Sequence, residues 1–211
     1  CGNRVGASFV LSTDVSKSYK KDYSLYKEES MDYVKGVVEY TGFLDTILNP
    51  YVQGVFAKII QSDPSLKDYK IVLSNVPMMN AASVGGEVII LYVPLLSRLS
   101  NEDQLVAILC HELAHGLLDH VQASIRKKLD DYYNADFQKE LKRIKKEEYN
   151  IDSKMTMLAR RFTVGTRYHD RSLEQQADSL GYMLMCKTPF NAAEFPGALA
   201  LLKRVDDPPF G

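Results

Sequence analysis

Hydrophobic residues recur at helical spacing in two stretches of the first third of the chain. In the first, tyrosines seven residues apart predict a helix with an aromatic stripe that ends near Thr41–Gly42. The stripe consists of Tyr19, Tyr23, Tyr26, Tyr33 and Tyr40. It is expected to pack on the rest of the protein, with an aromatic partner-binding face as the alternative. The second stretch predicts a helix that starts at Asn49–Pro50 and ends at Ser62.

The pattern then changes to runs of β-branched and apolar residues. Residues 69–73 and 87–93 each predict a strand. Between them lie Asn80–Ser83 and a glycine pair, Gly85 and Gly86, which suit a turn. We therefore expect an α+β fold that is mostly helical, with a small and largely antiparallel sheet.

A long helix is predicted to follow this sheet. Ser100 is a good N-cap, and Glu102 and Asp103 complement the helix dipole in the first turn. Leucines four residues apart then form a stripe that should be buried, namely Leu105, Leu109, Leu113 and Leu117. The helix is expected to run from about residue 101 to beyond residue 120.

The rest of the chain predicts further helices with one break. Residues 123–150 interleave basic and acidic side chains, which is typical of a solvated helix face; a lid over a cleft is the alternative. A helix is expected over residues 153–162, and a loop over residues 164–170 leads into the next helix. The last helix is capped at Asn191 and runs to Val205.

Composition narrows the class of protein. The chain has 211 residues, 45% hydrophobic and 25% charged, as in an ordinary globular domain. Its net charge of −1 gives no electrostatic basis for binding nucleic acid, so no such partner is expected. No run approaches the ~20 apolar residues of a membrane span. Residues 1–15 lack a clear period and predict a tether, followed by a single domain over residues 16–211.

Candidate chemistry lies in the predicted long helix, at the sequence HELAH. His111 and His115 are four residues apart, so on a helix both imidazoles project from one face and can bind one metal ion. Glu112 flanks this pair and is a candidate general base. His120 lies nine residues after His111, half a turn out of phase on a continuous helix. It is therefore expected to point away from the metal and to serve packing or capping.

Two histidines leave such a site incomplete, because catalytic zinc usually has three protein ligands. Glu174 is the natural third ligand. Asp178 lies four residues on, one helical turn away, and is expected to accept a hydrogen bond from the free ring nitrogen of a ligating His. The expected cofactor is one zinc ion per chain, although nitrogen and oxygen ligands would also take cobalt or manganese.

Together these motifs resemble the M48 metallopeptidases of the gluzincin group. The matching features, which span about residues 45–205, are HELAH at residues 111–115, Arg171-x-x-Glu174-x-x-Ala177-Asp178 followed by Gly181, and Asn80–Ala81 with the glycine pair. The resemblance implies a zincin-like fold and peptidase activity. It also implies that Asn80 and Ala81 lie on an edge strand that binds the substrate main chain as an added strand. A turn position is the alternative for Asn80.

Tyr168 and His169 are candidates for stabilising the oxyanion of a tetrahedral intermediate. They lie in the predicted loop shortly before Glu174, and either side chain can donate a hydrogen bond. An exposed loop position without a catalytic role is the alternative for His169.

The three cysteines give different expectations. Cys110 and Cys186 lie in apolar helix patterns and are expected as free thiols rather than as a disulfide. Cys1, followed by Gly2, resembles the start of a mature bacterial lipoprotein, with a boundary that happens to fall at a cysteine as the alternative. In the lipoprotein interpretation the protein lies on the periplasmic side of the bacterial cell envelope, at the outer membrane, and contacts the membrane only through a lipid on Cys1.

The predicted function is that of a zinc-dependent endopeptidase acting on exported or envelope polypeptides, and the family resemblance suggests quality control. One alternative is a lipid-anchored chaperone or scaffold whose zinc site lacks activity. Another is a latent peptidase blocked by its own chain. Glu112 argues against a purely structural site, which would be closed by a fourth ligand and would need no base.

Overall fold

A computed structural model describes residues 20–85, 87–146 and 149–206. The N-terminal part contains helix α2 (Lys20–Gly36), the π-helix η1 (Val37–Thr41), helix α3 (Leu48–Ser62), the 3-10 turn η2 (Pro64–Leu66) and strands β1 (Lys70–Ser74), β2 (Ala81–Ser83) and β3 (Val88–Tyr92). The remainder contains α4 (Val93–Leu96), α5 (Glu102–Leu117), α6 (His120–Tyr133), α7 (Ala135–Ile144), α8 (Ile151–Cys186), η3 (Ala192–Glu194) and α9 (Phe195–Asp206). The expected α+β class, mostly helical with a small sheet, is confirmed.

The sheet is mixed, so the expectation of a largely antiparallel sheet was wrong. Its order is β1-β3-β2: β3 pairs parallel with β1 from Lys70↔Val88 to Ser74↔Tyr92, and antiparallel with β2 from Ala81↔Leu91 to Ser83↔Ile89. All five residues of β3 are buried. Such a wholly apolar strand is stable at the centre of a sheet, where both faces are covered, and β2 is left at the edge.

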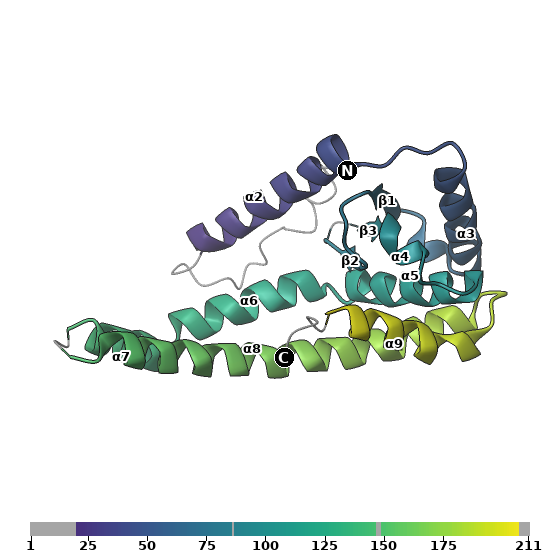
Figure 1. Cartoon of the computed structure of the whole chain (residues 1–211). Coiled ribbons are helices and arrows are strands. Elements are labelled where there is room, and N and C mark those ends of the chain that lie inside the picture. The colour runs from purple at the N-terminus through teal and green to yellow at the C-terminus, as the bar shows by residue number, and fades with distance from the viewer. Residues whose placement is uncertain (1–19, 86, 147–148, 207–211) are drawn as a thin grey trace.

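Helix α5 lies between the sheet and α3 on one side and α8 and α9 on the other (Figure 1). Every residue from Leu105 to Ala114 is buried, which includes most of the predicted leucine stripe. The N-cap is Asn101, whose side chain accepts a hydrogen bond from the backbone N–H of Gln104, rather than the neighbouring Ser100. The candidate metal-binding motif thus lies on a rigid helix inside the main core.

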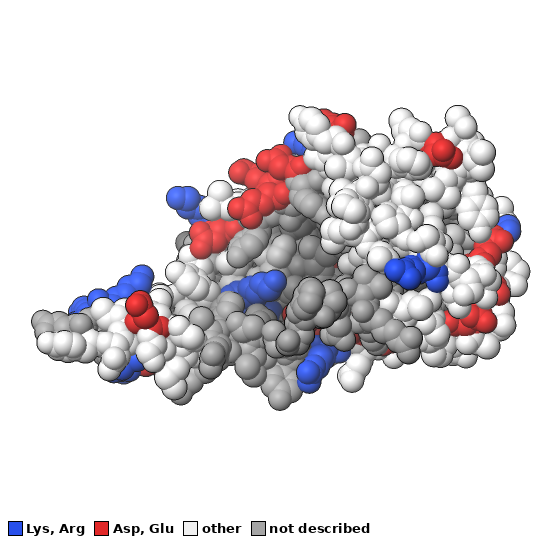
Figure 2. Space-filling view, viewed as in Figure 1, with Lys and Arg blue, Asp and Glu red and all other residues white. Residues whose placement is uncertain are grey.

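Helices α6 and α7 and the first part of α8 form an arm that extends from this body (Figure 1). The arm has a small core of its own around Leu141, Ile144 and Leu158. Its surface carries both signs of charge (Figure 2), including an ion pair of 2.7 Å between Arg143 and Glu140. This agrees with the predicted solvated helix face.

Helix α8 is continuous over 36 residues, so the predicted loop over residues 164–170 was wrong. No proline interrupts this stretch of sequence. Gly165, the one glycine within residues 164–170, costs a helix only about 1 kcal/mol, which packing of α8 against α5, α6 and α7 can offset.

Helix α2 packs against α6. Tyr23 is buried there beside Ile125 and Leu129, and its hydroxyl donates a hydrogen bond to Gln122. Of the other tyrosines in the predicted stripe, Tyr40 is 84% exposed. Tyr19 and the side chains of Tyr26 and Tyr33 lie outside the described residues. The tyrosine stripe therefore serves packing at Tyr23, and the helical stretch ends at Thr41 as predicted.

No helix among the described residues is both long and apolar enough to span a membrane.

Candidate metal centre

His111 and His115 meet on one face of α5. Their Nε2 atoms lie 3.1 Å apart, and their ring centroids are 4.7 Å apart. His111 is buried, with 5% of its surface exposed. The four-residue spacing therefore converges both imidazoles on one point, as the helix period predicts.

Glu174 reaches the same point from α8. Its Oε1 lies 3.4 Å from His115 Nε2 and its Oε2 lies 3.5 Å from His111 Nε2. Ligands of a tetrahedral zinc ion, with metal–ligand bonds of about 2.0–2.1 Å, are separated by about 3.3–3.4 Å. The spacing of these three side chains is thus close to that of a zinc site, with one ligand atom from each lying within 4.8 Å of the others. The two neighbouring imidazoles hold the pKa of Glu174 well below its ordinary value, so this carboxylate is ionised at neutral pH.

A close approach of α8 to α5 brings Glu174 within reach of the histidines. Gly181 lies against the backbone of α5, where an added Cβ would come within 2.9 Å of the Cα of His111. Ala177, between Glu174 and Gly181, is fully buried in the main core. Small residues at this contact let the helices pack at backbone distance, which gives Ala177 and Gly181 a physical role in the metal centre.

Asp178 lies one turn after Glu174, behind His111. Its Oδ1 is 3.1 Å from His111 Nδ1. A carboxylate at this distance favours the tautomer in which Nδ1 carries the proton and Nε2 faces the metal. The position is the one that the spacing of Glu174 and Asp178 predicts.

His120 does not point away from the site, which corrects the prediction. Helix α5 ends at Leu117, Asp119 adopts the left-handed conformation (φ 54°), and α6 begins at His120. The chain therefore turns back, and His120 Nδ1 lies 3.0 Å from His115 Nδ1. The prediction failed because it assumed one unbroken helix. The only sequence signal for the turn is Asp119, a residue type that tolerates positive φ.

Glu112 is buried beside the ligand pair and is held by the sheet. Its Oε2 accepts a hydrogen bond of 2.7 Å from the backbone N–H of Ser83 on β2. Sequence patterns could not identify Ser83 as this donor, because the donor is a main-chain group and any residue type can supply it.

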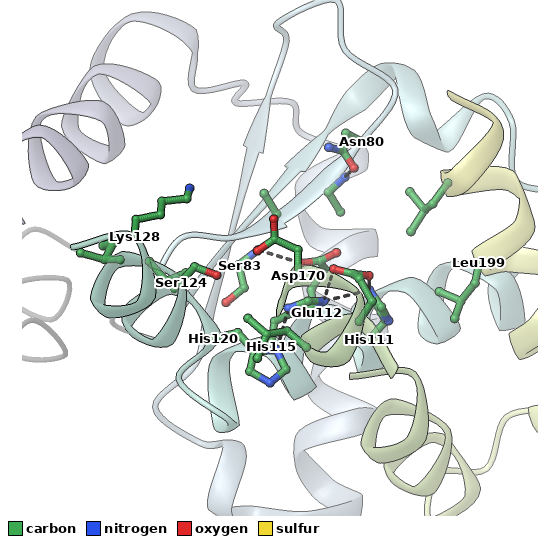
Figure 3. A pocket seen from close by; sticks show the side chains of 17 residues that line it. Asn80, Ser83, His111, Glu112, His115, His120, Ser124, Lys128, Asp170 and Leu199 are labelled. Carbon is green, nitrogen blue, oxygen red and sulfur yellow. Dashed lines mark hydrogen bonds and ion pairs between the residues drawn. The ribbon is translucent and has the colours of Figure 1, made fainter. Parts of the chain in front are cut away.

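A cavity of about 530 Å³ opens above the three ligand side chains and Glu112. Figure 3 shows Asn80, which directly precedes β2, and Ser83 of β2 along its rim, Ser124 and Lys128 of α6 at one end, and Leu199 of α9 at the other. The candidate metal centre is therefore open to ligands on the side that the sheet edge borders.

The edge strand β2 presents part of its main chain away from the sheet. Asn80 and Val84 exchange hydrogen bonds with β3, since the carbonyl of Asn80 accepts from Tyr92 and the N–H of Val84 donates to Val88. By strand alternation, the main-chain groups of Ala81 and Ser83 face the opposite edge. Asn80 also accepts, with its side chain, a hydrogen bond of 2.8 Å from the N–H of Ala81.

The oxyanion candidates are not brought into the site by any described contact. The backbone of Tyr168 and His169 belongs to α8, whereas their side chains lie outside the described residues.

Cys110 and Cys186 are free thiols, as predicted. Burial raises the pKa of Cys110 to about 12, so it is a neutral packing residue and no metal ligand.

Comparison with known proteins gives one family. The sequence model described as Peptidase family M48 matches residues 47–196, which is more than half of the chain and includes every ligand candidate. Curated proteins gave no match to this sequence.

Proposed function

Since the chain belongs to peptidase family M48 and is a metallopeptidase, we propose that it is a zinc-dependent endopeptidase that cleaves extended polypeptide segments. The observation that carries the proposal is the convergence of His111, His115 and Glu174, whose ligand atoms lie within 4.8 Å of one another. These three side chains and Glu112 line one open cavity. A structural zinc site would instead be closed by a fourth protein ligand.

Each residue has a defined task in this proposal. His111, His115 and Glu174 hold zinc, which when bound supplies a Lewis acid for a peptide carbonyl and for an attacking water. Glu112 accepts the proton of that water and later delivers it to the leaving amine. The N–H of Ser83 orients the Glu112 carboxylate from the sheet side.

The outer edge of β2 supports binding of a main chain rather than of particular side chains. The outward N–H groups of Ala81 and Ser83 already donate to Asn80 and Glu112, so a substrate segment would run beside β2 by donating its own N–H groups to the outward carbonyls of these two residues. Only an extended, unfolded segment can make this pairing, so folded proteins are expected to be poor substrates. Quality control of unfolded polypeptides is consistent with such a preference and remains a prediction.

Cleavage of an unstructured protein tests the proposal. Purified protein is treated with a chelator, and casein cleavage is measured before and after adding back one equivalent of zinc. We expect activity to be lost and then restored. A protein that rebinds zinc but never cleaves would favour the scaffold alternative. Activity that appeared after deletion or displacement of residues in the 123–150 region would instead indicate a latent peptidase.

The cellular setting rests on the first residues of the chain. Cys1 lies outside the described residues, and a lipid on it, with an outer-membrane location facing the periplasm, remains part of the proposal. Membrane fractionation and mass spectrometry of the N-terminal peptide from native cells would test both.

A further inference from the structure

The two histidines of the metal centre are each supported at Nδ1, but by different groups. Asp178 lies 3.1 Å from His111 Nδ1, whereas the neighbour of His115 Nδ1 is another imidazole, that of His120, at 3.0 Å. The rings of His115 and His120 are nearly perpendicular at 83°, with centroids 4.9 Å apart. They therefore meet through their nitrogens rather than by stacking of their faces.

Only one proton can lie between the two Nδ1 atoms. If the Nε2 of His115 binds the metal, its Nδ1 carries the proton and donates. The Nδ1 of His120 must then accept, so the proton of the His120 ring resides on Nε2. This tautomer pair is the only neutral arrangement that satisfies both the metal site and the contact of 3.0 Å.

The fold holds His120 in place to make this contact. Only Leu118 and the left-handed Asp119 connect α5 to α6, and the backbone N–H of Ala123 donates to the carbonyl of Asp119 at 3.0 Å. His120 is 4% exposed, and its neighbour Gln122 is fixed by Tyr23 of α2. The acceptor is thus rigid and shielded from water, conditions under which its hydrogen bond is strongest.

We propose that His120 is a positioning residue that holds His115 in the metal-binding tautomer and orientation by accepting its Nδ1–H. This inference rests on the proposed zinc site, and it assigns a role to a residue that is not itself a ligand. A packing residue of similar size would fill the same space but could not accept the hydrogen bond.

Two substitutions separate the hydrogen bond from packing. In His120→Asn the amide oxygen replaces Nδ1 as an acceptor, whereas His120→Leu fills the space without one. Zinc affinity is measured at one pH by competition with a chromophoric chelator. We expect His120→Leu to weaken zinc binding roughly 10- to 100-fold and His120→Asn to recover most of that loss. The visible spectrum of the cobalt-loaded protein should change in the Leu variant and return towards that of the wild type in the Asn variant.

The result that overturns the proposal is equal zinc affinity for wild type and His120→Leu, or an equal loss in both variants. A wild type that binds no zinc would instead refute the proposed zinc site itself. If His120→Leu fails to fold, ring-nitrogen NMR of the ¹⁵N-histidine-labelled, zinc-loaded wild type decides. We expect the His120 proton on Nε2, and a proton on its Nδ1 would contradict the proposal.

Discussion

The backbone N–H of Ser83 donates a hydrogen bond of 2.7 Å to Oε2 of Glu112. This contact joins the edge strand β2 to the candidate general base on α5, between two residues that are 29 positions apart in sequence. A substrate that pairs with β2 would therefore lie in register with the carboxylate that activates water. The strand that would bind the substrate and the carboxylate that would activate water are thus held at a fixed distance from each other. This limits the positions that a scissile bond can take.

Replacing Glu174 with Gln should remove the third ligand without a change in size. We expect zinc affinity to fall by roughly 100-fold or more, beyond the effect usual for residues that only support a ligand. Isothermal titration calorimetry of the metal-free protein with zinc measures this affinity. Gln175→Ala, at the adjacent exposed position of α8, is the matched control and should bind zinc as the wild type does. Similar affinities for Glu174→Gln and this control would rule Glu174 out as a ligand.

Asp178 should matter through His111 rather than through direct contact with the metal. Asp178→Ala removes the group 3.1 Å from His111 Nδ1, and we expect a loss of roughly 10- to 100-fold in zinc affinity. Ser179→Ala is a control on the same helix, because the Ser179 hydroxyl bonds only the carbonyl of Gln175 within the helix among the described contacts. An unchanged affinity in Asp178→Ala would show that His111 needs no such support.

The contact between α8 and α5 should respond to a single methyl group. In Gly181→Ala the new Cβ would come within 2.9 Å of the Cα of His111, so the helices must separate. We expect a loss of about 1–3 kcal/mol in the free energy of unfolding, together with weaker zinc binding. Gly197→Ala on α9, where nothing lies within 4 Å, should instead gain up to about 1 kcal/mol. Urea unfolding of both metal-free variants tests this contrast, and equal stabilities would contradict the packing account.

Stability should fall in alkali because of Cys110. Burial raises the pKa of its thiol from 9.0 to about 12, so between these values the unfolded chain ionises while the folded protein stays neutral. The stabilisation is complete below pH 9 and is lost as pH rises towards 12, at up to about 1.4 kcal/mol per pH unit. Cys110→Ala should show a shallower decline between pH 9 and 11 in urea unfolding. Parallel curves for the two proteins would show that the thiol does not contribute.

The convergence of the candidate ligands could be predicted from the sequence because helix geometry converts spacing directly into position. His111 and His115 needed only the 3.6-residue period, and Glu174 and Asp178 needed only a second helix with the same period. The packing of α8 on α5 was not readable from either pattern, although Gly181 marks the place where the two backbones meet.

The failures arose where one local conformation decides the outcome. A single left-handed residue, Asp119, reverses the chain and brings His120 to His115, and periodicity contains no information about such a turn. The parallel pairing of β1 with β3 depends on which strand occupies the centre of the sheet, which is a competition between tertiary arrangements. Ser83 acts through its main-chain N–H, so the identity of its side chain could not have predicted its contact with Glu112.

The most direct test of the central claim compares the wild type with Glu112→Gln for both zinc content and casein cleavage. Gln at this position retains an oxygen that can accept the Ser83 N–H, so the site should keep its shape. We predict one zinc per chain in both proteins and a rate of cleavage lower by about 10²- to 10⁴-fold in the variant. Cleavage by Glu112→Gln at the wild-type rate, with zinc bound, would contradict the assignment of Glu112 as the base of a zinc peptidase.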